Sequence, residues 1–229
     1  AKDAYRERNL GMIGGIDTYM SQNMPTHITG TRVGTDTVGA AFTGDTWAST
    51  KDTNTSTITI SNMSGATVTL AAGDTLTIAN VYDVNPVTKA QLPHLKNFVV
   101  QNAETASGSS ITSVELTPAI IVSGAHQTVY LNGITDLNTQ VVTYQGATGV
   151  AYPQNLFFHK NAFGLVMVPM VSPPGAVDVG RRSYKGYSCR VIPYYDGGND
   201  VSNWRLDVLY GVKCIDPRLA VRASLAADI

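Results

Sequence analysis

The sequence Val201–Cys214, VSNWRLDVLYGVKC, places apolar side chains on every second residue. Trp204, Leu206, Val208 and Tyr210 share one parity, and the charged residues share the other. A period of two is that of a β-strand, because successive side chains of a strand point to opposite faces. At about 3.3 Å per residue, twelve residues would span roughly 40 Å, which is long for a strand. The pattern predicts a long strand whose apolar face, with these four residues, belongs to the structural core.

The preceding residues predict a partner for this strand. Tyr187–Tyr195 forms a second strand-like run, and the sequence DGGND at Asp196–Asp200 is typical of a hairpin turn. The carboxylates of Asp196 and Asp200 could in principle serve as a general acid and base. In a turn of this composition, hydrogen bonding of aspartate to nearby backbone groups is the favoured role.

Short strand patterns fill the first two thirds of the chain. Residues 26–59 contain 12 threonines in 34 residues together with several glycines, a composition that favours strands and turns over helices. Strand-like runs follow at Thr57–Ile60, Thr67–Leu70, Thr75–Ile78, Phe98–Gln101, Val114–Leu116 and Ala119–Val122, with an AAGD turn at Ala71–Asp74. Short strands at this spacing indicate a small barrel or sandwich.

Charge is sparse along this chain. Only 14% of the residues are charged and 43% are apolar, and 16 basic residues against 17 acidic ones leave a net charge of -1. Such a balance gives no long-range attraction to nucleic acid or to a membrane surface. No apolar run reaches the roughly 18 residues that a transmembrane helix needs. The surface is therefore expected either to be covered by small polar residues or to be buried against neighbouring molecules.

No catalytic or metal-binding motif is recognisable. The chain lacks the G-x-S-x-G, P-loop and G-x-G-x-x-G patterns of hydrolases, NTPases and dinucleotide-binding proteins. The histidines have no metal-ligand spacing, so that a metal site would have to be assembled by the fold; they are His27, His94, His126 and His159. We expect no enzymatic activity and no cofactor or metal.

The two cysteines, Cys189 and Cys214, both occupy apolar-parity positions of strand-like runs. This placement predicts buried free thiols in a reducing compartment rather than a disulfide or a nucleophile.

A small basic cluster at Arg181, Arg182 and Lys185 allows two interpretations. It could contact nucleic acid, but a solvated loop or a loop that forms salt bridges between subunits is favoured.

Three segments together resemble the major capsid proteins of tailed bacteriophages. Residues 14–25, GGIDTYMSQNMP, resemble a glycine, aspartate-x-tyrosine and asparagine-x-proline segment of those proteins. Residues 155–170, NLFFHKNAFGLVMVPM, are similar to their phenylalanine, histidine and alanine-phenylalanine segment. Residues 195–222 are similar to their carboxy-terminal strand pair, with its Arg-x-Asp-Val-Leu-Tyr-Gly core. The order and spacing of the segments agree as well.

The resemblance implies a predominantly β fold of the α+β class, in the branch of short-tailed phage coats that carry an inserted antiparallel β-barrel domain. Residues 1–25 would be a peripheral-domain segment, residues 26–150 the inserted barrel, and residues 151–229 axial and peripheral segments. The family's long amino-terminal half, with its arm, extended loop and spine helix, does not precede Lys2. The chain is thus expected to correspond to the carboxy-terminal portion of such a coat protein.

The function implied by the resemblance is structural. The chain would help build an icosahedral shell around double-stranded phage DNA, in a virion or a prophage product assembled in the bacterial host cytoplasm. Its partners would be other copies, in pentamers and hexamers, together with scaffolding and portal proteins. Packaged DNA would be contacted only nonspecifically, and no membrane would be involved.

The hypothesis for intersubunit contact joins the acidic tip, Asp196 and Asp200, to the basic residues Arg181, Arg182 and Lys185 of a neighbour. A second interpretation of the chain treats the threonine-rich region as an adhesin-like or carbohydrate-binding module. That alternative leaves the long alternating strand of residues 201–214 unexplained.

Overall fold

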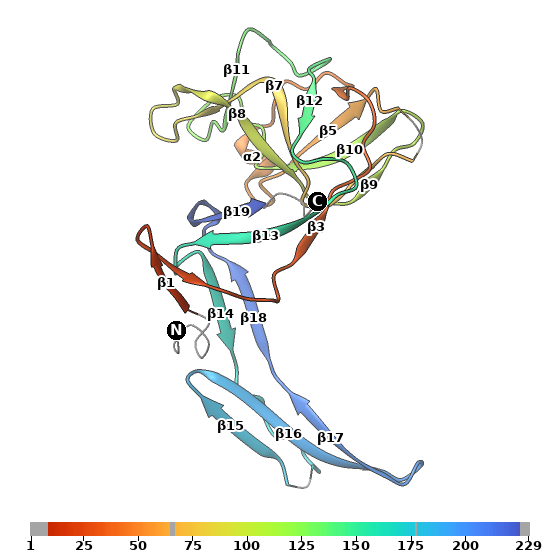
Figure 1. Ribbon diagram of the computed structural model, residues 1–229, viewed down its shortest axis with the longest axis vertical. Helices are drawn as coiled ribbons and strands as arrows, with labels where there is room; N and C mark the ends of the chain where they lie inside the picture. The colour runs from red at the N-terminus through yellow and green to blue at the C-terminus, as the bar shows by residue number, and fades with distance from the viewer. Residues whose placement is uncertain (1–8, 65–66, 177, 225–229) are drawn as a thin grey trace. The chain divides into compact units, whose positions relative to one another are not determined.

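The computed structural model describes residues 9–64, 67–176 and 178–224, and the chain divides into two units. Unit 1 comprises Ala1–Gln154 and Ser224–Ile229, and unit 2 comprises Asn155–Ala223. Strands dominate both units (Figure 1). Among the described residues, helical structure is limited to α2 (Trp47–Thr50) and the 3-10 turn η1 (Pro217–Leu219). The predicted predominance of β-structure is confirmed.

Unit 1 is built around a seven-stranded antiparallel sheet in the order β11-β7-β8-β10-β5-β4, with β12 beside β7. Its strands are β4 (Thr37–Val38), β5 (Ser56–Ser61), β7 (Thr75–Val84), β8 (Gln91–Val100), β10 (Ser110–Thr117), β11 (Val129–Leu131) and β12 (Val142–Tyr144). The sheet curls until β4 meets the residues around the start of β12. The Val38 N–H donates to Gln140 O, and the Val142 N–H donates to Asp36 O, both at 2.9 Å. These bonds join the two ends of the sheet.

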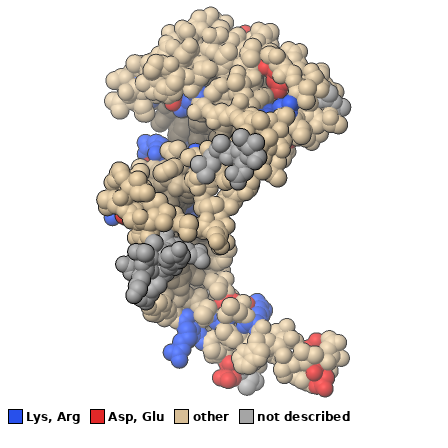
Figure 2. Space-filling model, viewed as in Figure 1, with Lys and Arg blue, Asp and Glu red and all other residues tan. Residues whose placement is uncertain are grey.

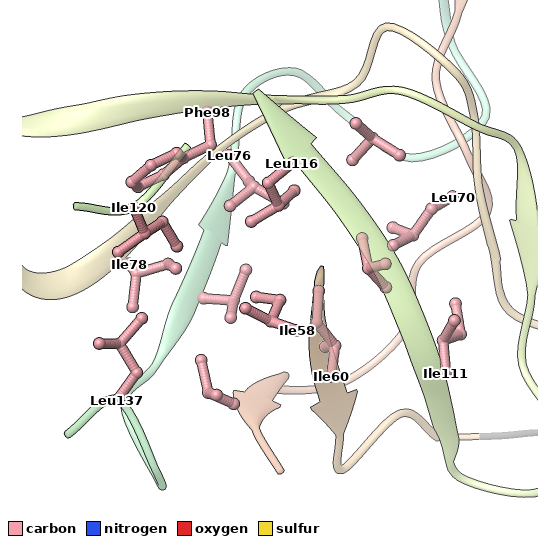
Figure 3. Close-up of a cluster of buried hydrophobic side chains, with 14 of the residues drawn as sticks. Ile58, Ile60, Leu70, Leu76, Ile78, Phe98, Ile111, Leu116, Ile120 and Leu137 are labelled. Carbon is pink, nitrogen blue, oxygen red and sulfur yellow. The ribbon is translucent and has the colours of Figure 1, made fainter. Parts of the chain in front are cut away.

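Strand periodicity fills the inside of the curled sheet with apolar side chains (Figure 3). In β5, Ile58 and Ile60 are buried on alternate positions, as the sequence Ser-Thr-Ile-Thr-Ile-Ser requires. Phe98 of β8 and Leu116 of β10 are both fully buried in the same cluster. The core of unit 1 is therefore the direct product of alternating threonine and β-branched or aliphatic residues.

Strand β7 changes the parity of its buried side chains in mid-course. Leu76 and Ile78 point into the core, and so does Val81, three residues after Ile78. The register with β8 shifts in this stretch, and Asn80 takes a left-handed conformation with φ of 63°. A bulge of this kind inserts an extra residue and reverses the side-chain alternation beyond it. This is why the sequence pattern indicated only the first part of the strand.

Most of the short strands predicted in unit 1 are present, but Ala119–Val122 is not a strand. These residues are buried or nearly so, yet they follow Pro118, which has no backbone N–H for a sheet ladder. Side chains satisfy the backbone instead: the Ile120 N–H donates to Ser56 Oγ, and the Ile121 N–H donates to Thr128 Oγ1. The apolar run therefore packs against the core as a loop.

The segments that lead into and out of the curled sheet are paired with each other. Strand β3 (Thr26–Ile28) runs antiparallel to the start of β13 (Ala151–Phe158). The buried carboxylate of Asp74 holds the same region, because Oδ2 accepts from the Gly30 N–H at 3.1 Å and Oδ1 lies 2.9 Å from His27 Nε2. The remaining described elements of unit 1 are β1 (Asn9–Ile13), β2 (Ile16–Tyr19), β6 (Thr69–Leu70) and β9 (Glu104–Thr105).

Unit 2 consists of narrow sheets. Strand β14 (Phe163–Met167) pairs with β18 (Tyr210–Cys214), and β15 (Gly180–Tyr184), β16 (Tyr187–Asp196) and β17 (Val201–Asp207) form a three-stranded antiparallel sheet. Strand β19 (Ala220–Ser224) pairs with β13. No helix in the described residues is long and apolar enough to cross a membrane.

A buried carboxyl group lies just before β4, at Asp36, whose exposed fraction is 2%. Its carboxylate oxygens, Nη1 of Arg32 and the hydroxyl of Tyr144 form no hydrogen bond of good geometry with the described residues, but Tyr144 and Arg32 lie close enough to Asp36 to oppose part of the effect of burial. The Arg32 guanidinium carbon lies 4.5 Å from the centroid of the Tyr144 ring. Burial disfavours the charged form of Asp36 and raises its pKa.

We predict that Asp36→Asn stabilises the chain at neutral pH. A carboxyl group with a raised pKa in the folded state contributes fully below its unfolded pKa of about 3.9, and the contribution is lost as the pH rises through the folded pKa. An asparagine amide stays neutral at every pH, so the variant keeps this contribution to stability at pH 7. Thermal unfolding should therefore give a higher midpoint for the variant at pH 7, and the difference should shrink toward pH 4. A larger gain at pH 4 than at pH 7 would contradict the assignment.

Candidate interaction surface

Two turns connect the strands of the three-stranded sheet β15–β16–β17. Lys185 and Gly186 connect β15 to β16 with φ of 47° and 86°, as a two-residue hairpin turn of the type with two positive φ values requires. The predicted DGGND turn connects β16 to β17, where Asp196 pairs with Val201. The hairpin predicted from the sequence is confirmed.

In the second turn, Asp196 has the predicted role of hydrogen bonding to the backbone, whereas Asp200 accepts a hydrogen bond from a side chain. Asp196 accepts hydrogen bonds from the Asn199 side-chain amide at 2.8 Å and from the Gly198 N–H at 3.0 Å. These donors stabilise the carboxylate and hold the pKa of Asp196 below its ordinary value. The Tyr195 hydroxyl donates to Asp200 Oδ1, and this bond raises the pKa of Tyr195. Both carboxylates lie at the exposed tip of the hairpin.

One face of the sheet, which we call the covered face, is buried in its middle by charge pairing, whereas Tyr194 and Val201 on the same face are about half exposed. Arg190 and Ile192 are both 8% exposed. Arg190 Nη2 donates to Asp207 Oδ2 at 2.6 Å, and its Nη1 donates to the carbonyl of Val171. Arg205 Nε donates to the other oxygen of Asp207 at 2.6 Å. The Arg190 hydrogen bond is the main reason why the pKa of Asp207 is lowered.

The opposite face of the sheet, which we call the open face, is aromatic and exposed. Directly paired residues of antiparallel strands point to the same side of a sheet. The register therefore shows which side chains of the three strands share the open face. Its large side chains, each more than half exposed, are Tyr184, Tyr187, Tyr195, Trp204 and Leu206. Arg182, opposite Cys189, lies on the same face. No segment of the described chain covers these side chains.

The prediction that Trp204, Leu206, Val208 and Tyr210 belong to a core is wrong for this chain. Their exposed fractions are 74%, 68%, 44% and 64%. The predicted single strand is also interrupted at Val208 and Leu209, because β17 pairs with β16 whereas β18 pairs with β14. Alternation correctly indicated a strand with one apolar face. It could not indicate whether the chain itself supplies a layer to cover that face.

The charges proposed for intersubunit contact are spread along the β15–β17 sheet (Figure 2), with Arg181 and Arg182 inside β15 and the other three in the turns. Lys185 lies in one turn, and Asp196 and Asp200 lie in the other, roughly 30 Å apart along β16 at about 3.3 Å per residue. The register separates Arg181 from Arg182, since Arg181 faces Arg190 on the covered face. Within the described chain none of these five residues forms a salt bridge. The fold therefore does not bring the predicted acids and bases together in one molecule.

Sequence reasoning missed the pairing of Arg190 with Asp207. Counting outward from the turn, where Asp196 pairs with Val201, would have aligned these two residues. The prediction of two buried thiols is only partly right, because both cysteines are free but Cys189 is half-buried and Cys214 is exposed. The part of the chain that the structure describes contains no group of three or more potential metal ligands.

Comparison with known proteins identifies the class of protein to which this chain belongs. The family model described as P22 coat protein, gene protein 5, matches residues 1–222. The chain belongs to this family of structural capsid proteins. The major capsid protein of Acyrthosiphon pisum secondary endosymbiont phage 1 is 27% identical over 225 residues, which cover 91% of this chain and 50% of that protein. The chain thus spans about half the length of the relative it matches. The predicted relationship to phage capsid proteins is confirmed.

We predict that Trp204→Ala changes the free energy of unfolding of the chain by no more than about 0.5 kcal/mol, as is usual for exposed positions. The buried Leu116 provides the matched comparison, because Leu116→Ala should cost about 2–5 kcal/mol. Urea unfolding followed by circular dichroism, at a protein concentration low enough to keep the chain monomeric, measures both. A loss for Trp204→Ala as large as that for Leu116→Ala would show that the open face is covered within the chain.

Proposed function

We propose that the chain is part of a major capsid protein that forms the icosahedral shell around double-stranded phage DNA. The match of the coat protein family over residues 1–222 carries this proposal. The structure of unit 2 supports it, because the buried apolar side chains among its described residues are only Ala162 and Ile192. A segment of this size with so little apolar burial gains its stability from neighbours.

Within this function, residues 26–150 would be the inserted β-barrel domain of a short-tailed phage coat, and residues 1–25 and 151–229 would be segments of peripheral and axial domains. Two observations support these boundaries. The sheet of unit 1 closes on itself through hydrogen bonds between β4 and residues 140–142. The pairing of Thr26–Ile28 with Ala151–Pro153 also brings the two ends of the domain together, as insertion into another domain requires.

The partners proposed for the assembled protein are further copies in pentamers and hexamers, a scaffolding protein and a portal protein. Assembly would take place in the cytoplasm of the bacterial host, and the mature protein would reside in the virion. The net charge of -1 supports only nonspecific contact with packaged DNA. An adhesin-like or carbohydrate-binding module is not favoured, since it would not explain why unit 2 exposes so many apolar side chains.

Electron microscopy tests the proposed function. The coat protein, expressed at its natural length together with its scaffolding protein, should give closed shells of uniform diameter. Soluble protein that is folded by circular dichroism but forms no shells under these conditions would refute the proposal.

We predict that residues 26–150 fold as an independent domain. The buried apolar cluster of unit 1 lies within this range, and its ladder bonds close within it as well. The isolated segment should therefore show dispersed amide NMR signals and a cooperative thermal transition. A collapsed, undispersed spectrum would argue against these domain boundaries.

A further inference from the structure

We propose that Asn132 is a site of spontaneous covalent modification, at which the side-chain amide is lost and aspartate and isoaspartate are formed. The proposal concerns the chemistry of one loop, and it is independent of the proposed shell-building function. It rests on three features: the residue that follows Asn132, the exposure of both residues, and the lack of hydrogen bonds from the described chain to the reacting groups.

The reactive pair begins the loop that leads from β11 to β12. Asn132 and Gly133 are both exposed. Asparagine is one of the thermolabile residues of proteins, and it reacts most readily before glycine, which has no side chain to hinder approach to its nitrogen. Asn132–Gly133 is the one such pair in the sequence. The turn itself requires the glycine, since Gly133 has a φ of 72°, which other residues adopt only with strain.

The reaction needs no enzyme and consumes one water molecule. The Gly133 nitrogen loses its proton to a base in solution and attacks Cγ of Asn132. The Cγ–Nδ2 bond breaks, and the amide takes a proton from water and leaves as ammonia. Water then opens the resulting succinimide ring at either carbonyl carbon, which gives aspartate or isoaspartate. Either product carries a carboxylate, so the net charge of -1 becomes one unit more negative.

Hydrogen bonds anchor the loop on both sides of the reactive pair but leave the reacting groups free. The Asn132 N–H donates to the carbonyl of Asn80 at 2.9 Å, and the Leu137 N–H donates to the carbonyl of Phe42 at 3.0 Å. Within the described chain, neither the Asn132 side chain nor the Gly133 N–H forms a hydrogen bond. Ring closure needs the side chain to turn toward the Gly133 nitrogen, and a loop without bonds allows this rotation at little cost.

The hairpin tip shows how bonding suppresses the same chemistry. The sequence contains one Asp-Gly pair, Asp196–Gly197, which can close the same ring. There the carboxylate accepts hydrogen bonds from the Asn199 side-chain amide and the Gly198 N–H, and these donors hold it in place. We therefore expect isoaspartate to accumulate at Asn132 and not at Asp196.

Peptide mapping by mass spectrometry, after incubation of the 229-residue chain at mildly alkaline pH, tests the site. Asn132 should convert within about tenfold of the rate in a free peptide of residues 130–136, because opening an unbonded loop costs little free energy. Asn138 is the matched control, since it is exposed in the same loop but precedes Thr139, whose branched side chain hinders attack. It should remain unchanged. Slower conversion of Asn132 than this limit would overturn the proposal.

The variant Asn132→Gln gives a second result. The longer side chain of glutamine closes a six-membered ring far more slowly, so the variant should gain neither the mass change nor the acidic form that ion-exchange chromatography detects in the aged wild type. An acidic form that arises at the wild-type rate in this variant, with normal circular dichroism, would show that the charge is gained elsewhere and would refute the assignment.

The coat protein of natural length provides the last comparison. Before assembly, its Asn132 should convert as in the 229-residue chain, because both anchors of the loop belong to unit 1. Conversion more than about tenfold slower than in the free peptide would show that the loop is closed in the longer protein and would overturn the proposal there.

Discussion

The structure depends on the burial of apolar side chains inside one curled sheet. The hydrophobic cluster extends from Val38 of β4 to Val142 of β12 and lies wholly within unit 1. Closure of the sheet through the Val38 and Val142 backbone bonds leaves few free strand edges around this cluster. Free edges invite pairing with other chains, so closure both protects the edges of unit 1 and encloses its apolar cluster.

Unit 2 is organised differently, because its strands are held by backbone ladders and charge pairs more than by a core. Strand β16 is paired on both sides, and its Arg190 is neutralised by Asp207 on the covered face. A buried ion pair gives little net stability, but removing either partner is costly, so it serves to specify one arrangement. The pair thereby specifies which face of the sheet is closed and which remains available.

The two units together suit a protein that assembles. Unit 1 contains almost all of the buried apolar side chains of the described residues, and unit 2 displays aromatic side chains such as Trp204 and Tyr195 that gain energy only when something covers them. The family match explains why such exposure is tolerated, since a coat protein spends its functional life in contact with its neighbours. Apolar surface that is exposed to water is unfavourable in a monomer, but its burial stabilises the contacts of a lattice.

Local chemistry made much of this structure predictable from the sequence. Alternating residues such as Ile58 and Ile60 define buried strand positions, and the composition of Asp196–Asp200 defines a hairpin turn, because both depend on near neighbours in the chain. The segments at residues 14–25, 155–170 and 195–222 were also enough to indicate the coat protein relationship.

Structural features that depend on residues far apart in the sequence could be decided only by the tertiary structure. Periodicity assigned Trp204 and Leu206 to an apolar face, but whether that face is buried depends on a covering layer that alternation does not encode. The division of residues 201–214 into two strands follows from their different partners, β16 and β14. Burial of Asp36 follows from the curling of a sheet whose strands are far apart in sequence. Sequence by itself determined which residues alternate and turn, and the tertiary structure decided which of the resulting faces meet.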